Sequence, residues 1–317
     1  MTFYMGNPAS NSTMLKTTAK KSKLRRRATH LGEIVRHSAV TPRTGQTHLP
    51  VLASGEKLGM TFIGHSSFFL QMSGQNIVID LNFARWLFVL KRLRVPGVRL
   101  RDLPPIDLVL VTHAHFDHLH RPSLRALVQQ ARRHGKQPPV IVVPHHVKDL
   151  VADLGFAEVV EMDWWNSYRH DVENHDPLTI THVPSRHWGA RILRDSYRGY
   201  GGYVLQDNRH SVYHAGDTAY FSGFREIGER LGAPEIALLP IGAYNPASFR
   251  NVHTSPADAV RGFLDLKARW MVPMHYGTFR LSQEPMEEPL ELLRKEAKAA
   301  GINDRVAVLE EGVTQFF

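Results

Sequence analysis

One stretch of the sequence decides the fold: residues 111–120, which read VTHAHFDHLH. It follows an apolar run, residues 106–111, that predicts a buried strand. Side chains alternate between the two faces of an extended chain, so His113, His115 and Asp117 are expected to point the same way. His118 follows as the chain turns. His113 and His115 suit one metal ion, and Asp117 and His118 suit a second ion on the order of 3.5–4 Å away.

Composition limits the kinds of site and partner that the chain can have. It has 317 residues, no cysteine, and a net charge of +9 with a pI near 9.8. Without cysteine there are no disulfides or thiolate metal sites, so any metal must bind nitrogen and oxygen. The positive charge favours acidic partners. No apolar run reaches about 18 residues, and the first residues lack the apolar centre of a secretion signal, so we expect a cytoplasmic protein.

Composition also divides the chain into two regions. Residues 1–57 contain a basic cluster at residues 20–27 and few large apolar side chains. We expect a partly disordered basic arm here, of a kind that suits an acidic surface. Residues 58–317 contain short strands separated by glycine turns, and we expect them to form one folded domain.

The predicted elements of this domain are mostly strands, without a strict alternation of strand and helix. Strands are expected at residues 60–63, 68–72, 77–80, 106–111, 140–143, 178–183, 202–205, 211–214, 236–239 and 270–274. Helices are expected at residues 122–133, 145–154, 224–231, 256–267 and 287–299, with Ser255 as a cap. This order favours sheets packed face to face with helices outside.

Three more candidate ligands follow other predicted strands. They are His187, Asp217 and His275, and each closes a strand and opens a loop. A site for two ions needs them, because each ion takes about four to six donors including water. Asp217 is the natural bridging carboxylate, since Gly216 before it lets the backbone approach closely.

This set of residues resembles a known pattern. An H-x-H-x-D-H motif, a lone histidine, a G-D-T motif and a late histidine resemble the metallo-β-lactamase superfamily. The closer resemblance is to its N-acyl-phosphatidylethanolamine-hydrolysing phospholipase D branch. The segments that carry it, from about residue 58 to the end, are 64–67 (GHSS), 103–107 (LPPID), 162–165 (MDWW), 184–188 (PSRHW), 216–220 (GDTAY), 240–244 (PIGAY), 253–256 (HTSP) and 275–279 (HYGTF). One departure is Asp80-Leu81, where the family usually has Asp-Pro.

The resemblance implies an α/β fold, a four-layer αββα sandwich of two mixed sheets with outer helices and with metals at one edge. One zinc would be held by His113, His115, His187 and Asp217. The other would be held by Asp117, His118, Asp217 and His275. Iron or manganese also suits these ligands. The implied activity is a phospholipase D type phosphodiesterase, in which a hydroxide bridging the metals attacks the phosphorus of N-acyl-phosphatidylethanolamine or a related phospholipid.

Other residues are expected to support this chemistry. Asp117 would also orient the nucleophile. His253 would support a metal ligand from outside or assist the leaving group, and the alternative is that it only packs within its loop. His65 would hydrogen-bond a metal ligand from outside. Aromatic side chains that could line an apolar substrate pocket, although aromatic residues also pack in cores, are Trp164, Trp165, Trp188 and Tyr244. Histidines expected at the surface or at helix ends are His120, His145 and His146.

Three other functions stay open on the sequence. A small-molecule hydrolase such as a lactonase would have a closed, polar pocket. A nuclease would suit the charge, but there is no aromatic-basic groove pattern, so nucleic acid is not the expected partner. A binding protein with structural metals would be expected to have a closed mononuclear site, unlike this seven-residue ligand set.

The segment Phe83–Arg101 combines bulky apolar side chains with basic ones, among which Arg92 and Arg94 are expected to face the lipid. Such a segment suits an anionic membrane interface, with the basic arm as a second contact, so the protein would be peripheral on the membrane. The alternative is an amphipathic element whose apolar side packs on the domain. A homodimer is also compatible with the sequence.

Overall fold

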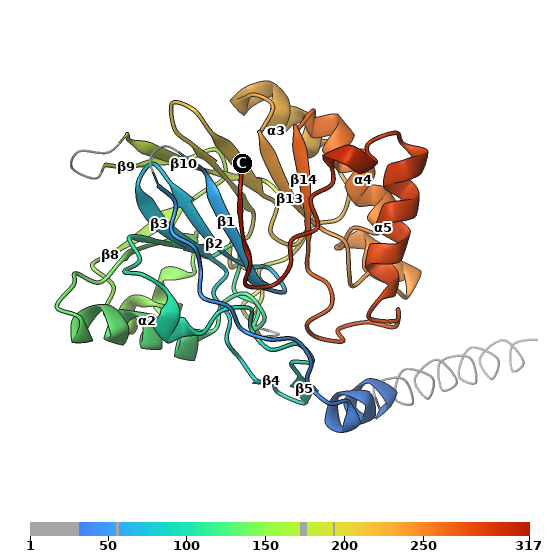
Figure 1. Ribbon diagram of the computed structural model, residues 1–317, viewed down its shortest axis with the longest axis horizontal. Helices are drawn as coiled ribbons and strands as arrows, with labels where there is room; N and C mark the ends of the chain where they lie inside the picture. The colour runs from blue at the N-terminus through green and yellow to red at the C-terminus, as the bar shows by residue number, and fades with distance from the viewer. Residues whose placement is uncertain (1–31, 55–56, 172–175, 193) are drawn as a thin grey trace, which may run out of the picture.

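The computed structural model describes residues 32–54, 57–171, 176–192 and 194–317. Figure 1 shows two sheets facing each other, with helices on the outer side of each. The first sheet has seven strands in the order β15-β1-β2-β3-β6-β7-β8. They are β1 (Gly59–Gly64), β2 (Ser67–Met72), β3 (Gln75–Ile79), β6 (Leu108–Leu110), β7 (Val140–Pro144), β8 (Glu158–Met162) and β15 (Thr314–Phe316).

The second sheet has six strands in the order β14-β13-β12-β11-β10-β9. They are β9 (Ser167–His170), β10 (Leu178–Val183), β11 (Gly202–Gln206), β12 (Ser211–His214), β13 (Ile236–Pro240) and β14 (Trp270–Met274). Both sheets are mixed, because antiparallel pairs at one side give way to parallel pairs at the other. A separate hairpin is formed by β4 (Trp86–Leu87) and β5 (Leu90–Lys91).

Helices complete the four layers, as the sequence predicts. Side chains of α2 (Arg121–Arg133) join a core cluster with one face of the first sheet. Side chains of α3 (Gly223–Leu231), α4 (Pro256–Leu266) and α5 (Glu288–Ala299) join the larger cluster, which also fills the space between the sheets. Neighbouring residues of one strand enter different clusters, Phe62 the larger one and Ile63 the smaller one. This alternation shows that the first sheet is buried on both faces.

The parallel pairs place several strand ends at one edge. β3 and β6 are parallel, and so are β12, β13 and β14, so within each sheet their carboxyl ends meet. The loops that leave these ends begin near Asp80, Thr112, Ala215 and His275. The expected gathering of polar residues at one edge therefore has a structural basis in both sheets.

Some predicted elements differ from those observed. Residues 145–154 form no α-helix but two 3-10 turns, Lys148–Leu150 and Ala152–Leu154. His146 has a positive φ of 59°, which an α-helix cannot contain. The sequence analysis did not predict β8, β9 and β15. These strands lie at the edges of the sheets, and their mixed polar and apolar residues form no apolar run. The cap at Ser255 is confirmed, since its hydroxyl accepts the backbone N–H of Asp258 and the Asp258 carboxylate accepts the N–H of Ser255.

Part of the expected arm lies against the domain. Residues 32–40 are helical, and the chain after them pairs with the segment that follows β5 through Thr44 and Arg94. The backbone N–H of Val51 donates to Thr314 Oγ1, and that of Ala53 donates to Gln71 Oε1. The basic cluster at residues 20–27 lies outside the described residues.

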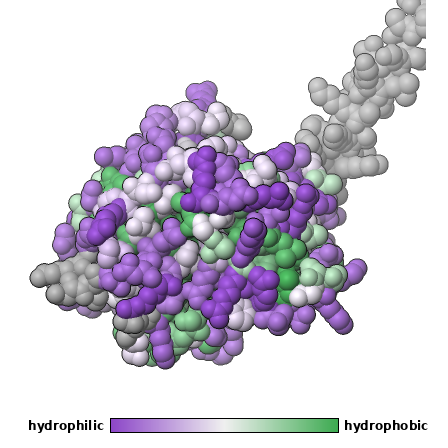
Figure 2. All heavy atoms as spheres, turned by 90° about the horizontal axis from the view of Figure 1, so that it is seen from above, coloured by the Kyte–Doolittle hydropathy of each residue, from purple (hydrophilic) through white to green (hydrophobic). Residues whose placement is uncertain are grey.

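The surface is mostly polar in the view from above. Figure 2 shows hydrophilic side chains over most of this face, with hydrophobic ones in limited patches. Within the described ranges, no helix has the length and apolar character needed to cross a membrane.

Candidate metal centre

The loop after β6, residues 111–120, brings the first four candidate ligands together, and we call it the donor loop. Nε2 of His113 lies 2.8 Å from Nδ1 of His115, and Nε2 of His118 lies 3.6 Å from Oδ2 of Asp117. The backbone carbonyl of His115 accepts the N–H groups of both His118 and Leu119, which tightens the turn. The motif that opened the sequence analysis therefore forms one compact set of donors.

Asp80 holds this loop in place, although the sequence analysis gave it no role. It is fully buried after β3 with a φ of 48°. Its Oδ1 accepts the backbone N–H of Thr112 at 2.8 Å, and its Oδ2 accepts the Thr112 hydroxyl at 2.7 Å. Nδ1 of His118 lies 2.7 Å from the same Oδ2, so Nε2 of His118 is left to face the other donors. The signal that could have revealed Asp80 is its place at the end of a strand parallel to β6.

Asp217 lies between the two sets of histidines. Its Oδ1 is 3.3 Å from Nε2 of His118, and its Oδ2 is 3.1 Å from Nε2 of His275. The same Oδ2 is 3.8 Å from Nε2 of His187 and 4.0 Å from Nε2 of His113. One carboxylate thus reaches donors from both groups, which is the position expected of a bridging ligand.

The donor atoms of the seven predicted ligands, together with those of His65, form two groups of four residues. Donor atoms of His113, His115, His187 and Asp217 all lie within 4.8 Å of one another. The same holds for His65, Asp117, His118 and His275. A third set within this limit is Asp217, His253 and His275, so His253 adjoins both groups. All of these residues are buried except His115 and Asp117, which are partly exposed.

His65 lies closer to the centre than the sequence analysis expected. Its Nε2 is 3.0 Å from Oδ2 of Asp117, and its ring lies 4.2 Å from that of His275. Its backbone N–H donates to Thr278 Oγ1, and its carbonyl accepts the N–H of His275. Through these contacts the turn between β1 and β2 holds both the donor loop and the loop after β14.

The carboxylates are strongly ionised in this setting. Burial opposes the charge of Asp217, but His275 and His118 outweigh it and hold the pKa of Asp217 well below its usual range. Asp117 has the same balance, with burial outweighed first by His118, and its pKa is also held well below the usual range. Both side chains therefore carry a negative charge at neutral pH, as metal ligands must.

The histidines divide into two sets by the direction in which their pKa values move. Burial opposes protonation of His118 and His275, but the negative charge of Asp217 outweighs burial at both. The pKa of His118 is raised well above its ordinary value, and the pKa of His275 is raised to about 9. Burial instead lowers the pKa of His113 and His187 well below the ordinary value, and lowers that of His253 to about 4. Most of the cluster is thus ready to act as neutral nitrogen donors.

Several donor atoms that point inward contact the opposite charge without making a well-directed hydrogen bond. Nε2 of His118, Nε2 of His275, Oδ1 of Asp217 and Nδ1 of His253 are shielded from solvent and have no hydrogen-bond partner among the described residues. A buried polar group without a partner costs about 1–3 kcal/mol, so several at one point need an explanation. Metal ions supply it, because imidazole and carboxylate donors suit zinc, iron or manganese. The residues present therefore fit metal binding.

The aromatic residues predicted to line the substrate pocket lie in different places. Trp188 is 42% exposed, and its ring lies 4.3 Å from His187 and 4.8 Å from His115. Trp164 is also partly exposed and donates to the carbonyl of Tyr200. Trp165 packs on the main core beneath the guanidinium of Arg230. The hydroxyl of Tyr244 donates to Glu288. Of these four, Trp188 is the one in ring contact with the donor histidines.

The remaining histidines stay outside the clusters. His120 precedes α2, and its Nδ1 lies 2.7 Å from the hydroxyl of Ser123. His145 and His146 are exposed, and their ring centroids lie 3.8 Å apart with the rings tilted by 56°. Their places match the expectation of surface and helix-end positions.

The segment Phe83–Arg101 has its charges elsewhere than the sequence suggests. Arg92 is fully buried, with Nε donating to the carbonyl of Ala84 and Nη2 to that of Asn82. Arg94 pairs with Glu311 at 2.5 Å. The interpretation of Arg92 as a charge facing a membrane is therefore wrong, because its guanidinium fastens the base of the β4–β5 hairpin instead.

The tip of that hairpin is exposed and apolar. Trp86, Phe88 and Val89 are 44%, 75% and 51% exposed. The Phe88 ring packs edge-on against the ring of Phe116 in the donor loop, with 4.6 Å between the ring centroids. The guanidinium of Arg191 stacks on the Phe116 ring at 3.8 Å. Arg191 also donates to the carbonyls of Ala114 and Leu119. The sequence analysis did not single out Phe116 or Arg191, because neither their packing nor these bonds follow a local pattern.

Comparison with known proteins places these features in a family. The model of the beta-lactamase superfamily domain matches residues 75–276, which include all seven predicted ligands. An N-acyl-phosphatidylethanolamine-hydrolyzing phospholipase D of Saccharomyces cerevisiae is 32% identical over 266 residues, which is 81% of this chain and 55% of the yeast protein. A metal-dependent hydrolase of Methanopyrus kandleri is 31% identical and is covered over 97% of its length, with 80% of this chain.

A solved structure supports the same assignment. A metallo hydrolase of Ignicoccus hospitalis superposes with a TM-score of 0.61 at 26% identity, over 82% of this chain and 98% of that one. The chain therefore belongs to the beta-lactamase superfamily and is a metal-dependent hydrolase with the metallo-β-lactamase fold.

Proposed function

We propose that the protein is a binuclear phosphodiesterase of phospholipase D type, acting on N-acyl-phosphatidylethanolamine or a related phospholipid. The observation that carries the proposal is the pair of donor groups that meet at Asp217, with the exposed rings of Trp188 and Phe88 nearby. Charged donors and an apolar rim on the same edge suit a substrate with a charged head and an apolar body. The printed activity of the yeast relative supports the same class.

The chain's own residues would hold the ions and the reacting groups. His113, His115 and His187 would hold one ion, Asp117, His118 and His275 the other, and Asp217 both. When bound, zinc, or iron or manganese, supplies positive charge that favours ionisation of water and neutralises the phosphoryl oxygens. Asp80 would keep His118 in the orientation that the site requires, through its 2.7 Å contact with Nδ1.

His253 is our candidate for moving the proton. Burial lowers its pKa to about 4, so its ring is neutral at pH 7 and can accept a proton. It would take the proton of the attacking water as the new P–O bond forms. It would then return that proton to the alcohol oxygen that leaves as the old P–O bond breaks. His65 would fix Asp117 through the 3.0 Å contact between Nε2 and Oδ2.

The hairpin tip is our candidate for contact with an anionic membrane surface. Trp86, Phe88 and Val89 expose apolar area beside the basic residue Arg85, a combination that favours the interface of a bilayer. Phe88 touches the donor loop through Phe116, so a lipid drawn from the bilayer at this point would enter beside the candidate metal centre. This docking role replaces the one first given to Arg92.

A substrate panel tests the proposal. We expect purified protein loaded with zinc to release the head-group amide from N-acyl-phosphatidylethanolamine vesicles, and to lose this activity with a chelator. His253→Ala should lower kcat about 10²-fold or more while the metal content stays unchanged, because proton transfer contributes about that much. Hydrolysis of a lactone or of nucleic acid in place of any phospholipid would reject the proposal and favour another hydrolase of this fold.

A further inference from the structure

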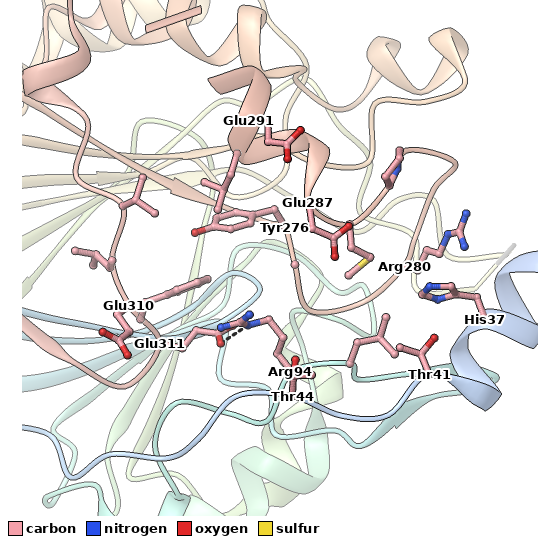
Figure 3. Close-up of a pocket in the computed structure, with 18 of the residues that line it drawn as sticks. His37, Thr41, Thr44, Arg94, Tyr276, Arg280, Glu287, Glu291, Glu310 and Glu311 are labelled. Carbon is pink, nitrogen blue, oxygen red and sulfur yellow. Dashed lines mark hydrogen bonds and ion pairs between the residues drawn. The ribbon is translucent and has the colours of Figure 1, made fainter. Parts of the chain in front are cut away.

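A cavity lies beside the loop that follows His275, with Tyr276 and Gly277 in its wall. It has a volume of about 630 Å³ and opens between the end of the helix at residues 32–40, the start of α5 and the chain before β15. Figure 3 shows Tyr276 with Glu291 above it, Glu287 to its right and Arg94 below. We call this cavity the α5 groove. Its volume falls within the range of about 300–1,000 Å³ that small-molecule sites occupy.

The floor of the α5 groove is apolar. Phe62, Leu93 and Leu309 line it and are 2%, 5% and 8% exposed. Leu290 of α5 and the ring of Tyr276 add partly buried apolar area. An aliphatic chain placed here would leave water at roughly 25 cal/mol for each Å² that it buries.

The rim of the groove carries charges of both signs that do not pair with each other. The side chains of Glu287, Glu291 and Glu310 make no ion pair within 4.0 Å among the described residues, and neither do those of Arg280 and Arg294. Arg94 and Glu311, which also line the groove, pair with each other at 2.5 Å, with Glu311 buried and Arg94 exposed. Figure 3 shows Arg280 and Glu287 on different parts of the wall.

Two further atoms of the wall are without partners. Nε of Arg280 and Nδ1 of His37 are shielded from solvent and make no hydrogen bond with the described residues. Arg280 lowers and Glu287 raises the pKa of His37, after the larger lowering by burial, so these three groups share one local field. The end of the groove near Arg280 therefore offers donors to an anion, while the carboxylates on α5 face a cation.

We propose that the α5 groove binds a zwitterionic single-chain amphiphile, a molecule with an aliphatic chain and a head that contains both an ammonium and a phosphate group. A head of this kind satisfies carboxylates and guanidinium groups at once, whereas a simple cation or anion leaves one set unpaired. The apolar floor takes the chain. The proposal does not depend on the reaction at the metal centre, so it stands or fails apart from the proposed function.

The groove adjoins the metal centre without containing it. Tyr276 and Gly277 follow the candidate ligand His275 directly, and they line both the groove and a small cavity of about 20 Å³ that reaches His275. A ligand in the groove would pack against the loop of Tyr276 and Gly277. This loop begins at His275, whose backbone N–H donates to the carbonyl of His65. The site is therefore placed to influence how firmly His275 is held.

Calorimetric titration of the full-length, metal-loaded protein tests this inference with four probes that share a dodecyl chain. They are dodecylphosphocholine, dodecyl sulfate, dodecyltrimethylammonium and dodecyl maltoside, each kept below the concentration at which it forms micelles. We expect dodecylphosphocholine to bind about threefold to fivefold more tightly than each of the others, which is the upper part of the range for exposed ion pairs. Equal affinities, no binding, or tightest binding of the purely cationic or anionic probe would overturn the proposal.

Substitutions then locate the site. The double variant Glu287→Gln and Glu291→Gln should reduce the affinity for dodecylphosphocholine to that for dodecyl sulfate, and Arg294→Gln should reduce it about threefold or more. The matched control is Glu229→Gln, an exposed residue on α3 away from the groove. Circular dichroism and metal content establish that each variant is folded. Unchanged affinity in folded groove variants, or equal loss in the control, would overturn the assignment.

Discussion

The donor loop at residues 111–120 and the β4–β5 hairpin touch each other but are built differently. In the donor loop the ligand side chains are largely buried, and carboxylate or backbone partners fix their orientation. In the hairpin the base is fastened by Arg92, while Phe88 at the tip is 75% exposed. The comparison teaches that one segment is shaped for precise geometry, and the other presents a surface that another molecule can cover.

The largest expected effect is at the carboxylate shared by the two donor groups. Asp217→Ala removes a donor that lies 3.3 Å from His118 and 3.1 Å from His275. We expect turnover to fall about 10³-fold or more, because charge stabilisation by metal ions contributes several kcal/mol. Metal content should fall too, while circular dichroism stays that of the wild type. Wild-type turnover with full metal content would contradict the bridging role.

The support of the donor loop is tested at Asp80. Asp80→Ala removes the acceptor for Thr112 and His118 without removing a ligand. We expect zinc affinity, measured by competition with a chelator, to fall about 10- to 100-fold, the usual cost of losing a partner that orients a ligand. The matched control is Asp107→Ala, at the other end of β6, which should leave zinc affinity unchanged. An equal loss in both variants would mean that Asp80 acts only through general stability.

Much of the fold could be predicted from the sequence, and so could the gathering of candidate donors. The strands and the face-to-face sheets follow from local apolar patterns, and the seven candidate ligands gather because each follows the end of a strand. The buried state of Arg92 could not be predicted, because a basic residue between apolar ones looks like the polar side of an amphipathic element. Its partners are carbonyls of Asn82 and Ala84, reached only when the hairpin folds back.

The α5 groove was equally hidden in the sequence. Phe62, Leu93, Tyr276 and Leu309 come from four distant parts of the chain, and no periodic pattern joins them. The segment at residues 145–154 shows the opposite case, in which a local pattern predicts an element that does not form. Its apolar spacing suits a helix, but His146 has a left-handed backbone conformation, which an α-helix cannot contain. Local patterns therefore predict elements and strand-end donors, but not the cavities that tertiary packing leaves.

The protonation of the metal-free site gives a further prediction. Both His118 and His275 have pKa values raised by Asp217, the latter to about 9, so both hold protons at pH 7 in the metal-free protein. A metal needs the neutral ring, so binding must release these protons and affinity must rise with pH until about pH 9. We expect zinc affinity to rise about tenfold or more per unit between pH 6 and 8. Calorimetry in buffers of different ionisation enthalpy measures the release, and pH-independent affinity would contradict this charge state.

The smallest expected effect concerns the hairpin tip. Phe88→Asp should weaken binding to anionic vesicles several-fold and slow hydrolysis of vesicle-borne substrate, because a charge replaces exposed apolar area at the interface. Hydrolysis of a soluble phosphodiester should not change. The comparison variant is Arg92→Ala, which should lower the free energy of unfolding by about 1–3 kcal/mol, since it leaves buried carbonyls unpaired. If Phe88→Asp slows both substrates equally, the tip is structural and does not dock on lipid.

The central claim is that one carboxylate serves two ions in a phospholipid diesterase. Its most direct test is the titration of zinc into chelator-treated protein, with head-group release from N-acyl-phosphatidylethanolamine followed at each addition. We predict that activity rises to a plateau at two equivalents per chain, and that Asp217→Ala stays near background throughout. A plateau at one equivalent, or turnover that the chelator does not remove, would contradict the account.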